Sequence, residues 1–200
     1  MNTLIGRLSP GITDMIRMDH SHVMTTFHQY DANASARVKR GLVDSVCVAL
    51  EIHAQLEEEI FYPALRAVAE TDMVKKSVPE HDEMRRLIAQ VRKLKPGDPG
   101  YDDAFWQLMN TVMHHVADEE TLLLPAAERV LADQLGELGA RMTKRRLQLV
   151  APRSGEIAGG MVRSMGAGSI VAGAGALLAC SYLLSRPRGF ERKQQHQGIR

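Results

Sequence analysis

HAQLEEEIFYPAL (residues 53–65) and HHVADEETLLLPAA (residues 114–127) are two versions of one sequence segment. The pairs that match in their alignment are His53 with His115, Glu57 with Glu119, Glu58 with Glu120 and Pro63 with Pro125. Residues four apart on a helix lie on one face, so each segment presents an imidazole and a carboxylate to a common point. The repeat therefore predicts two facing helices that carry the same pair of metal-binding groups.

A further histidine precedes each copy of the segment at a matching distance. His20, in MDHSHVM, lies 33 residues before His53, and His81, in PEHDEM, lies 34 residues before His115. Each half of the chain is therefore expected to form a helical hairpin. Two hairpins of the same plan pack together as an all-α, up-down four-helix bundle.

Apolar residues recur at intervals of three and four through the first 150 residues, which is the period of an amphipathic helix. Turn signals divide this part into expected helices over residues 13–30, 35–70, 72–94 and 101–132, followed by a short basic fifth helix over 134–149. The run KPGDPG (residues 95–100) is the clearest loop. Pro63 and Pro125 lie late in the second and fourth helices, so we expect each to kink or end its helix.

The composition changes after Pro152. Residues 1–150 hold 18 Lys and Arg against 22 Asp and Glu, whereas residues 151–200 hold seven against two. We therefore expect a helical domain over residues 1–150 and a Gly/Ala-rich tail over residues 151–200. The basic excess lies in the tail and is not interleaved with aromatic residues, so no nucleic-acid partner is predicted.

Residues 164–185, SMGAGSIVAGAGALLACSYLLS, form an uncharged run in the tail. The run is long enough for a transmembrane helix, which needs about 20 residues. Small residues recur at every fourth position from Ser164 to Cys180, and such a stripe lets membrane helices pack closely or self-associate. The alternative is a flexible Gly/Ala tail. Basic residues flank both ends, so the orientation of a membrane helix cannot be read.

The two cysteines, Cys47 and Cys180, form neither a CxxC pair nor a disulfide framework. This usage is typical of a reducing cytosol. The apolar run at the N-terminus is too short for a secretory signal. We therefore expect a cytoplasmic protein. The tail suggests an alternative in which residues 164–185 anchor this protein to a membrane. Cys47 is interpreted as a small core residue.

The paired histidines and glutamates form one candidate metal site. A lone histidine or a lone His-x-x-x-Glu pair is usually a surface feature or an ion pair, but the spacing here matches in both halves of the chain. The set contains no thiolate, which argues against structural zinc, whereas imidazole and carboxylate suit iron and a carboxylate can bridge two metals. We expect one metal per half and at least one open coordination position. The candidate ligands are His20, His53, Glu57, His81, His115 and Glu119.

These motifs resemble those of the hemerythrin-like family, also called the hemerythrin HHE cation-binding domain. The resemblance covers roughly residues 10–135 and rests on four segments: DHSHV, HAQLEEEIFYP, PEHDEM and HHVADEETLLLP. It implies a four-helix bundle that holds two iron ions, joined by an oxo, hydroxo or water bridge. It also implies that the family's ligands correspond to the six residues named above.

The chain departs from the oxygen-carrying members of that family at one ligand. Those proteins supply five histidines, two of them four residues apart on the third helix. Here the positions four residues from His81 hold Ser77 and Arg85. The remaining candidates for a fifth ligand are His22, His28 and His114, although the repeat favours His115 over its neighbour.

Fewer imidazoles leave more open coordination, which favours redox turnover over reversible oxygen carriage. We therefore predict a non-haem di-iron protein that handles peroxide or nitric oxide, with a low-rate peroxide-decomposing activity as the enzyme hypothesis. The alternatives are reversible binding or sensing of dioxygen or nitric oxide, iron holding without turnover, and an interaction module with a structural metal. A ferritin-like oxidase is disfavoured, because it needs four carboxylates and Glu-x-x-His spacing.

The remaining polar residues near the motifs receive simpler interpretations. Glu58, Glu59 and Glu120 are interpreted as solvated side chains or as hydrogen-bond partners of the ligating histidines. Tyr62 and Trp106 are interpreted as core or rim residues rather than redox relays. No catalytic residue is assigned.

Overall fold

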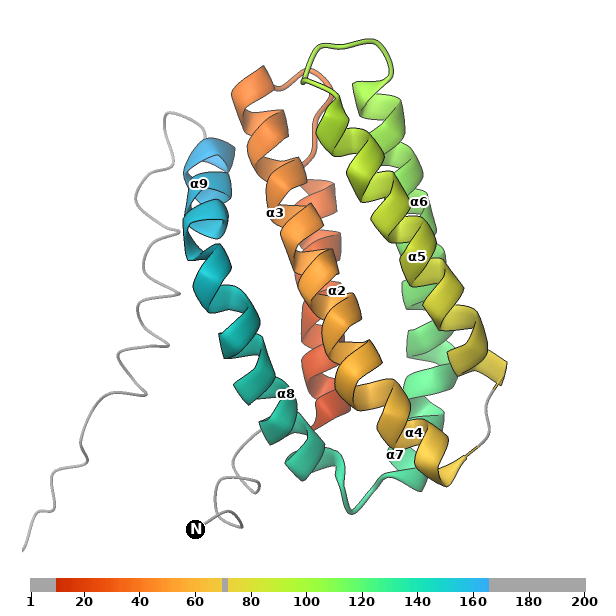
Figure 1. Cartoon of the computed structure of the whole chain (residues 1–200). Coiled ribbons are helices and arrows are strands. Elements are labelled where there is room, and N and C mark those ends of the chain that lie inside the picture. Colours follow the sequence, from red (N-terminus) through yellow and green to blue (C-terminus); the bar gives the residue numbers. More distant parts are fainter. Residues whose placement is uncertain (1–9, 70–71, 166–200) are drawn as a thin grey trace, which may run out of the picture. The chain divides into compact units, whose positions relative to one another are not determined.

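The computed structural model describes residues 10–69 and 72–165, and all of its regular structure in these ranges is helical (Figure 1). The all-α fold class is therefore confirmed. Two five-residue π-helical turns, η1 and η2, interrupt the helices, and a short 3-10 turn, η3, spans Ala151–Arg153. The elements are α2 (Ile12–His28), α3 (Ala36–Leu56), η1 (Glu57–Phe61), α4 (Tyr62–Val68), α5 (Asp72–Lys93), α6 (Tyr101–Asp118), η2 (Glu119–Leu123), α7 (Leu124–Val130), α8 (Leu135–Val150) and α9 (Ser154–Ser164).

The helix ends follow local capping chemistry. The hydroxyl of Ser35 accepts a hydrogen bond from the backbone N–H of Val38 and so caps α3. The carboxylate of Asp14, in the first turn of α2, accepts one from the backbone N–H of Gly11. The predicted loop between α5 and α6 is present, and Gly97 and Gly100 adopt the positive φ angles that glycine tolerates best.

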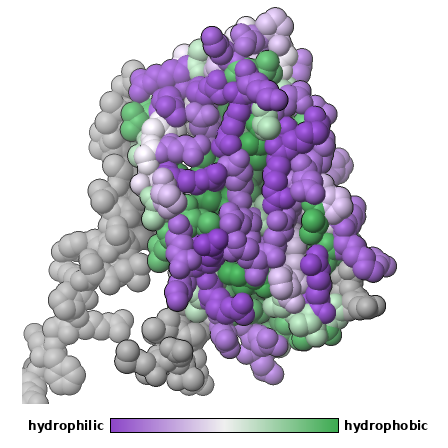
Figure 2. Space-filling model, viewed as in Figure 1, coloured by the Kyte–Doolittle hydropathy of each residue, from purple (hydrophilic) through white to green (hydrophobic). Residues whose placement is uncertain are grey.

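The long helices lie side by side in Figure 1, with α2 packed on α3 and α5 packed on α6. Two apolar clusters fill the space between them, one around Phe27 and Phe105 and the other around Ile16 and Phe61. Polar side chains dominate the face shown in Figure 2, with hydrophobic ones visible between them. The helices therefore bury their apolar stripes against one another.

Cys47 belongs to the first apolar cluster and is fully buried. Burial raises the pKa of its thiol to about 12, so the sulfur stays protonated at neutral pH. This environment agrees with the interpretation of Cys47 as a core residue, because the nucleophilic form of cysteine is the thiolate.

The two prolines coincide with the π-helical turns. Pro63 and Pro125 are the second residues of α4 and α7, directly after η1 and η2. Proline has no N–H and its ring collides with the carbonyl four residues earlier, so the regular α-helical ladder cannot continue. The backbone widens by one residue instead, and the N–H of Tyr62 bonds to the carbonyl of Glu57. The predicted disruption thus takes the form of a π-helical turn that begins at a candidate ligand.

Helix α8 closely matches the predicted fifth helix, whereas α9 falls in the segment that the sequence assigns to the tail. Helix α9 packs along α3, where Arg163 forms an ion pair with Asp44 at 2.9 Å. The two backbones approach closely at Gly41, where a Cβ atom would lie 2.4 Å from the backbone nitrogen of Ser164. Glycine at this position allows the contact.

Within residues 10–69 and 72–165, no helix combines the length and the apolar character that crossing a membrane requires. The predicted membrane helix over residues 164–185 lies outside the described residues, except for its first two positions.

The close approach at Gly41 leads to a stability prediction. Gly41→Ala should lower the free energy of unfolding by about 1–3 kcal/mol, because the added methyl group meets backbone atoms that cannot rotate away. The matched control is Gly155→Ala in α9, where a Cβ atom would meet nothing within 4 Å, so stability should be unchanged or rise by up to about 1 kcal/mol. Urea denaturation followed by circular dichroism measures both. Equal losses in the two variants would contradict close α3–α9 packing.

Candidate metal centre

The structure brings all six candidate ligands to one buried layer. None of them is more than 4% exposed. On α2 and α5 the histidine lies between residues of the two apolar clusters, as His20 does between Ile16 and Val23. The contributing elements are α2 for His20, α3 for His53, η1 for Glu57, α5 for His81, α6 for His115 and η2 for Glu119.

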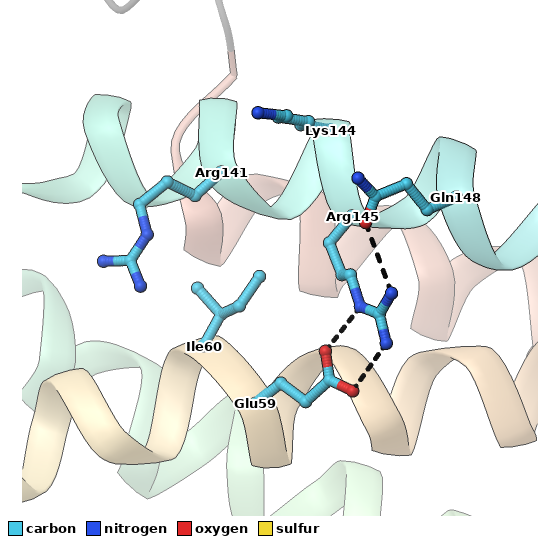
Figure 3. A pocket seen from close by; sticks show the side chains of 6 residues that line it. All are labelled: Glu59, Ile60, Arg141, Lys144, Arg145 and Gln148. Carbon is cyan, nitrogen blue, oxygen red and sulfur yellow. Dashed lines mark hydrogen bonds and ion pairs between the residues drawn. The ribbon is translucent and has the colours of Figure 1, made fainter.

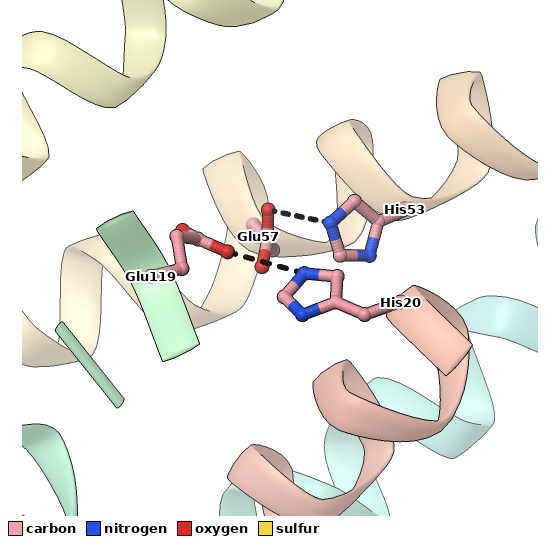
Figure 4. A group of neighbouring side chains, drawn as sticks. All are labelled: His20, His53, Glu57 and Glu119. Atoms are coloured by element: carbon pink, nitrogen blue, oxygen red, sulfur yellow. Dashed lines mark ion pairs between the residues drawn. The ribbon is translucent and has the colours of Figure 1, made fainter. Parts of the chain in front are cut away.

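The six side chains form two overlapping groups, each able to hold a metal ion. His20, His53, Glu57 and Glu119 make up the first group, which Figure 4 shows. Glu57 also belongs to the second group, with His81 and His115. Within each group the ligand atoms lie within 4.8 Å of one another.

The glutamates cross between the two hairpins, whereas the sequence predicts separate halves with one glutamate each. Glu57 Oε2 lies 3.2 Å from Nε2 of His53, on its own helix, and 3.4 Å from Nε2 of His81, on the other hairpin. The equivalent distances in the second repeat are 3.6 Å from Glu119 Oε2 to His115 Nε2 and 3.4 Å from Glu119 Oε2 to His20 Nε2. Each carboxylate therefore faces imidazoles from both hairpins.

The outward-facing Nδ1 atom of every imidazole lies next to a carboxylate. Metal-bound histidines characteristically donate their second ring N–H in this way, which sets the tautomer and leaves the other nitrogen free to bind. Here that leaves Nε2 pointing inward. The pairs are His20 with Glu120 at 2.8 Å, His53 with Asp19 at 3.5 Å, His81 with Glu58 at 2.9 Å and His115 with Glu80 at 3.0 Å.

Sequence analysis identified half of these outer carboxylates. Glu58 and Glu120 do contact histidines, whereas Glu59 pairs with Arg145 at the surface. Asp19 and Glu80 were missed. A signal for both was present, because each directly precedes a candidate ligand histidine at equivalent places in the two halves.

A cation in turn holds each outer carboxylate. Three of these cations are arginines and one is a lysine, so a positive charge lies behind every carboxylate that orients an imidazole. The pairs are Arg17 with Glu120 at 3.2 Å, Arg146 with Asp19 at 2.6 Å, Arg85 with Glu58 at 2.7 Å and Lys76 with Glu80 at 3.4 Å.

Electrostatics keep the central carboxylate charged. Burial alone would raise the pKa of Glu57, but His53 and His81 hold that pKa well below its usual range. Burial likewise opposes charge on His53, yet Glu57 and Asp19 raise the pKa of His53 well above its usual value. The buried anion therefore requires a cation beside it, either a protonated imidazole or a metal ion.

Unsatisfied polar atoms converge at the same place. Among the described residues, the buried ligand atoms without a hydrogen-bond partner are His20 Nε2, His53 Nε2, Glu57 Oε1 and Glu119 Oε2. Buried polar atoms are nearly always paired, because leaving one unpaired costs about 1–3 kcal/mol. Four such atoms in one layer fit coordination of a metal cation, since nitrogen and carboxylate oxygen donors are all present.

The sequence pattern of the hemerythrin HHE cation-binding domain matches residues 11–148. The chain belongs to this family. A crystal structure of a hemerythrin HHE cation-binding domain-containing protein from Mycobacterium kansasii has the same fold, with a TM-score of 0.63 at 22% identity. The match covers 78% of this chain and 99% of that one.

Curated relatives of this hemerythrin-like chain share about a third of its residues over the matched region. A Nostoc protein named DNA nickase is 30% identical over 144 residues, and the chain spans only 41% of that protein's length. Uncharacterised proteins of Mycobacterium tuberculosis and Mycobacterium bovis are 30% identical over 122 residues. These matches cover 60% of this chain and 74% of the mycobacterial proteins.

No described histidine completes a five-histidine set in this hemerythrin-like domain. His22, His28 and His114 are all exposed on the helix surface. The position four residues before His81 holds Ser77, which is buried. The departure that the sequence indicates is therefore present in the structure.

Tyr62 belongs to the second apolar cluster, as its interpretation as a core residue predicts, but its hydroxyl lies among the candidate ligands, a place that the sequence analysis did not assign to it. This hydroxyl donates a hydrogen bond to Glu119 Oε1 at 2.8 Å and lies 3.4 Å from His81 Nε2. Burial and the nearby carboxylates raise the pKa of Tyr62, so the phenol stays protonated. Leu124 takes the equivalent place in the second repeat, and this break in the repeat was the available signal.

The shared position of Glu57 generates a prediction on metal binding. Glu57→Ala should abolish binding of divalent cations to both groups, because each group needs its carboxylate. Glu59→Ala is the control, since that side chain bonds to Gln55 and Arg145 instead. Elemental analysis and the metal-dependent rise in thermal stability measure the effect. Retention of metal by Glu57→Ala, or its loss from Glu59→Ala, would contradict the assigned geometry.

Proposed function

We propose that this chain is a non-haem di-iron protein, with one iron ion in each group and Glu57 shared between them. The proposed frame is an up-down four-helix bundle that supplies one histidine from each of four helices. The proposal is supported by the donor set of four imidazoles and two carboxylates, which suits iron better than a thiolate-binding metal. The unpaired donor atoms at the centre support it as well.

The proposed activity is the handling of peroxide or nitric oxide. Bound iron would supply the redox chemistry at this centre. The observation that carries this choice is the missing fifth histidine, because the positions four residues from His81 hold Ser77 and Arg85, whereas oxygen-carrying members of the family have two histidines four residues apart on this helix. With four histidines, coordination positions on the metal ions stay open to small molecules. A fifth histidine would fill a position on one of the iron ions.

Tyr62 is the proposed proton donor. Its hydroxyl is fully buried between the two groups and bonds to Glu119, while Glu57 Oε2 lies 3.3 Å away. The phenol stays protonated beside the two carboxylates and can orient a bound small molecule, and the positive charge of bound iron would lower its pKa and so make the proton easier to transfer. The burial of all six ligands also excludes bulk water, which limits the substrate to small molecules.

Reversible binding or sensing of dioxygen or nitric oxide is the second candidate. The complete burial of the six ligands favours it, because a site closed to water protects a bound small molecule from displacement. Iron holding without turnover belongs with this candidate. Peroxide consumption and spectral reversibility distinguish the two functions.

Iron content tests the metal assignment. The purified chain, loaded anaerobically with ferrous iron, should contain about two irons per chain, as expected for two groups of nitrogen and oxygen donors. Elemental analysis and the absorption spectrum before and after dithionite measure this. A single bound zinc, or no metal after reconstitution, would refute the proposal.

Tyr62→Phe tests the chemistry separately from metal binding. The variant should keep its iron, because phenylalanine fills the same buried space, while peroxide consumption falls by about 100-fold, as is typical for loss of a proton-transfer group. Oxygen evolution from added peroxide is the measurement, and Trp106→Phe, at an exposed position outside the site, is the control. An unchanged rate in Tyr62→Phe would remove its role as proton donor. A stable spectral band that deoxygenation reverses, without peroxide turnover, would return the protein to the binding class.

A further inference from the structure

Arg146, on α8, reaches the metal centre through a single intervening residue. Its Nη1 donates to Asp19 Oδ1 at 2.6 Å and its Nη2 donates to Asp19 Oδ2 at 2.6 Å. Asp19 Oδ2 in turn faces Nδ1 of His53 at 3.5 Å. We propose that Arg146 is a positioning residue of the metal centre, which couples the docking of α8 to metal occupancy. This inference rests on the proposed function as a metal protein.

Each of the four histidines contacts a carboxylate that is paired with a cation. The cation behind His53 differs from the three others in the helix that carries it. Arg17 lies on α2, while Lys76 and Arg85 both lie on α5, so these three cations belong to helices that themselves carry candidate ligands. Helix α8 carries no candidate ligand. Among the described residues, His53 is therefore the histidine whose orientation depends on an added helix.

The geometry indicates that Arg146, rather than His53, sets the position of Asp19. The separation of 3.5 Å between Asp19 and His53 is at the long end for a hydrogen bond, whereas the three other histidine–carboxylate pairs lie at 2.8 to 3.0 Å. The two contacts from Arg146 are short and bidentate, and a planar guanidinium holds a carboxylate in one orientation. Without Arg146, the partly exposed Asp19 is free to turn to water, and His53 loses the group that directs its Nε2 inward.

Docking of α8 depends on the face that carries Arg146. Met142 and Leu138, four and eight residues earlier, lie on the same face and are buried in the second apolar cluster. Gly139 brings α8 close to the start of α2, since a Cβ atom there would lie 2.1 Å from the carbonyl oxygen of Pro10. Helix α8 is thus held against the helix that contains Asp19.

Coupling between the two events is necessarily reciprocal. If docking of α8 favours the orientation of His53 that binds a metal ion, the bound ion must favour docking of α8 by the same free energy. Metal binding should therefore protect the backbone amides of α8, which lie outside the metal centre itself.

Arg145 provides a matched control in the same helix. It forms a bidentate pair with Glu59, at 2.6 and 2.9 Å, and its side chain is 34% exposed against 29% for Arg146. Figure 3 shows this pair at a groove between η1 and α8. The groove has a volume of about 310 Å³. Arg145 and Arg146 thus make the same kind of contact, but only the pair made by Arg146 leads to a histidine of the centre.

The experiment compares the full chain with Arg146→Ala, Arg146→Lys and Arg145→Ala. Each metal-free protein is titrated anaerobically with ferrous iron and with cobalt(II), whose absorption bands report ligand geometry. Arg146→Ala should weaken metal affinity by about 10- to 100-fold, as is typical when the hydrogen-bonded support of a metal ligand is lost. Arg146→Lys keeps the positive charge but not the bidentate contact, so its metal affinity should lie between those of Arg146→Ala and the wild type. Arg145→Ala should bind metal with wild-type affinity.

Hydrogen exchange supplies a readout that activity does not. Metal should slow exchange in α8 of the wild type and of Arg145→Ala, but not in Arg146→Ala. If Arg146→Ala does not fold, Arg146→Lys provides the test. Wild-type metal affinity in Arg146→Lys, together with wild-type protection of α8 from hydrogen exchange, would overturn the positioning role of the bidentate guanidinium. If the wild type binds metal and Arg146→Ala binds it with the same affinity, the positioning role of Arg146 is overturned, while the proposed function is not. Failure of the wild type to bind either ion overturns the proposed function along with it.

Discussion

Two carboxylates, Glu57 and Glu119, are buried among four imidazoles between two apolar clusters, and the surrounding structure compensates for this charge. An isolated ion in such an interior is strongly disfavoured unless it is paired and hydrogen-bonded. The pairing here is arranged in layers. Imidazoles face the central carboxylates, outer carboxylates face the imidazoles, and arginine or lysine side chains face the outer carboxylates. The layers run from the centre of the helical domain to its surface.

The backbone places these carboxylates by a device that the two repeats share. A proline six residues after each central glutamate prevents a regular α-helix, and the resulting π-helical turn begins at the glutamate itself. Glu58 and Glu120, the second residues of these turns, contact histidines on the opposite hairpin. A single backbone irregularity in each half therefore supplies both an inner and an outer carboxylate. Interruptions of this kind in α-helices are frequently found at functional sites.

The differences between the two repeats identify the residues with individual roles. The repeat yields a symmetric set of four histidines and two glutamates, which form two groups that could each hold a metal ion. Tyr62 has Leu124 as its counterpart, so the proposed proton donor stands on one side of the centre only. Arg146 belongs to a helix outside the repeat, so one of the four histidines depends on a segment that the others do not need. Reactivity and regulation are thus assigned to the departures from symmetry.

The sequence by itself determined the helical fold class, the ranges of the helical segments up to α8 to within a few residues, and the six side chains that meet at the centre, whereas it assigned α9 to the tail. These features follow from local geometry, because the spacing of three and four residues sets the face of a helix and a proline marks where it changes. Tertiary structure alone decided the crossing of the glutamates, the place of the Tyr62 hydroxyl and the contact from Arg146 to Asp19. Those contacts join residues far apart in the chain, 57 positions for Tyr62 and Glu119 and 127 for Arg146 and Asp19. Helix periodicity says which face a residue occupies, but only the packing of the helices decides what that face meets.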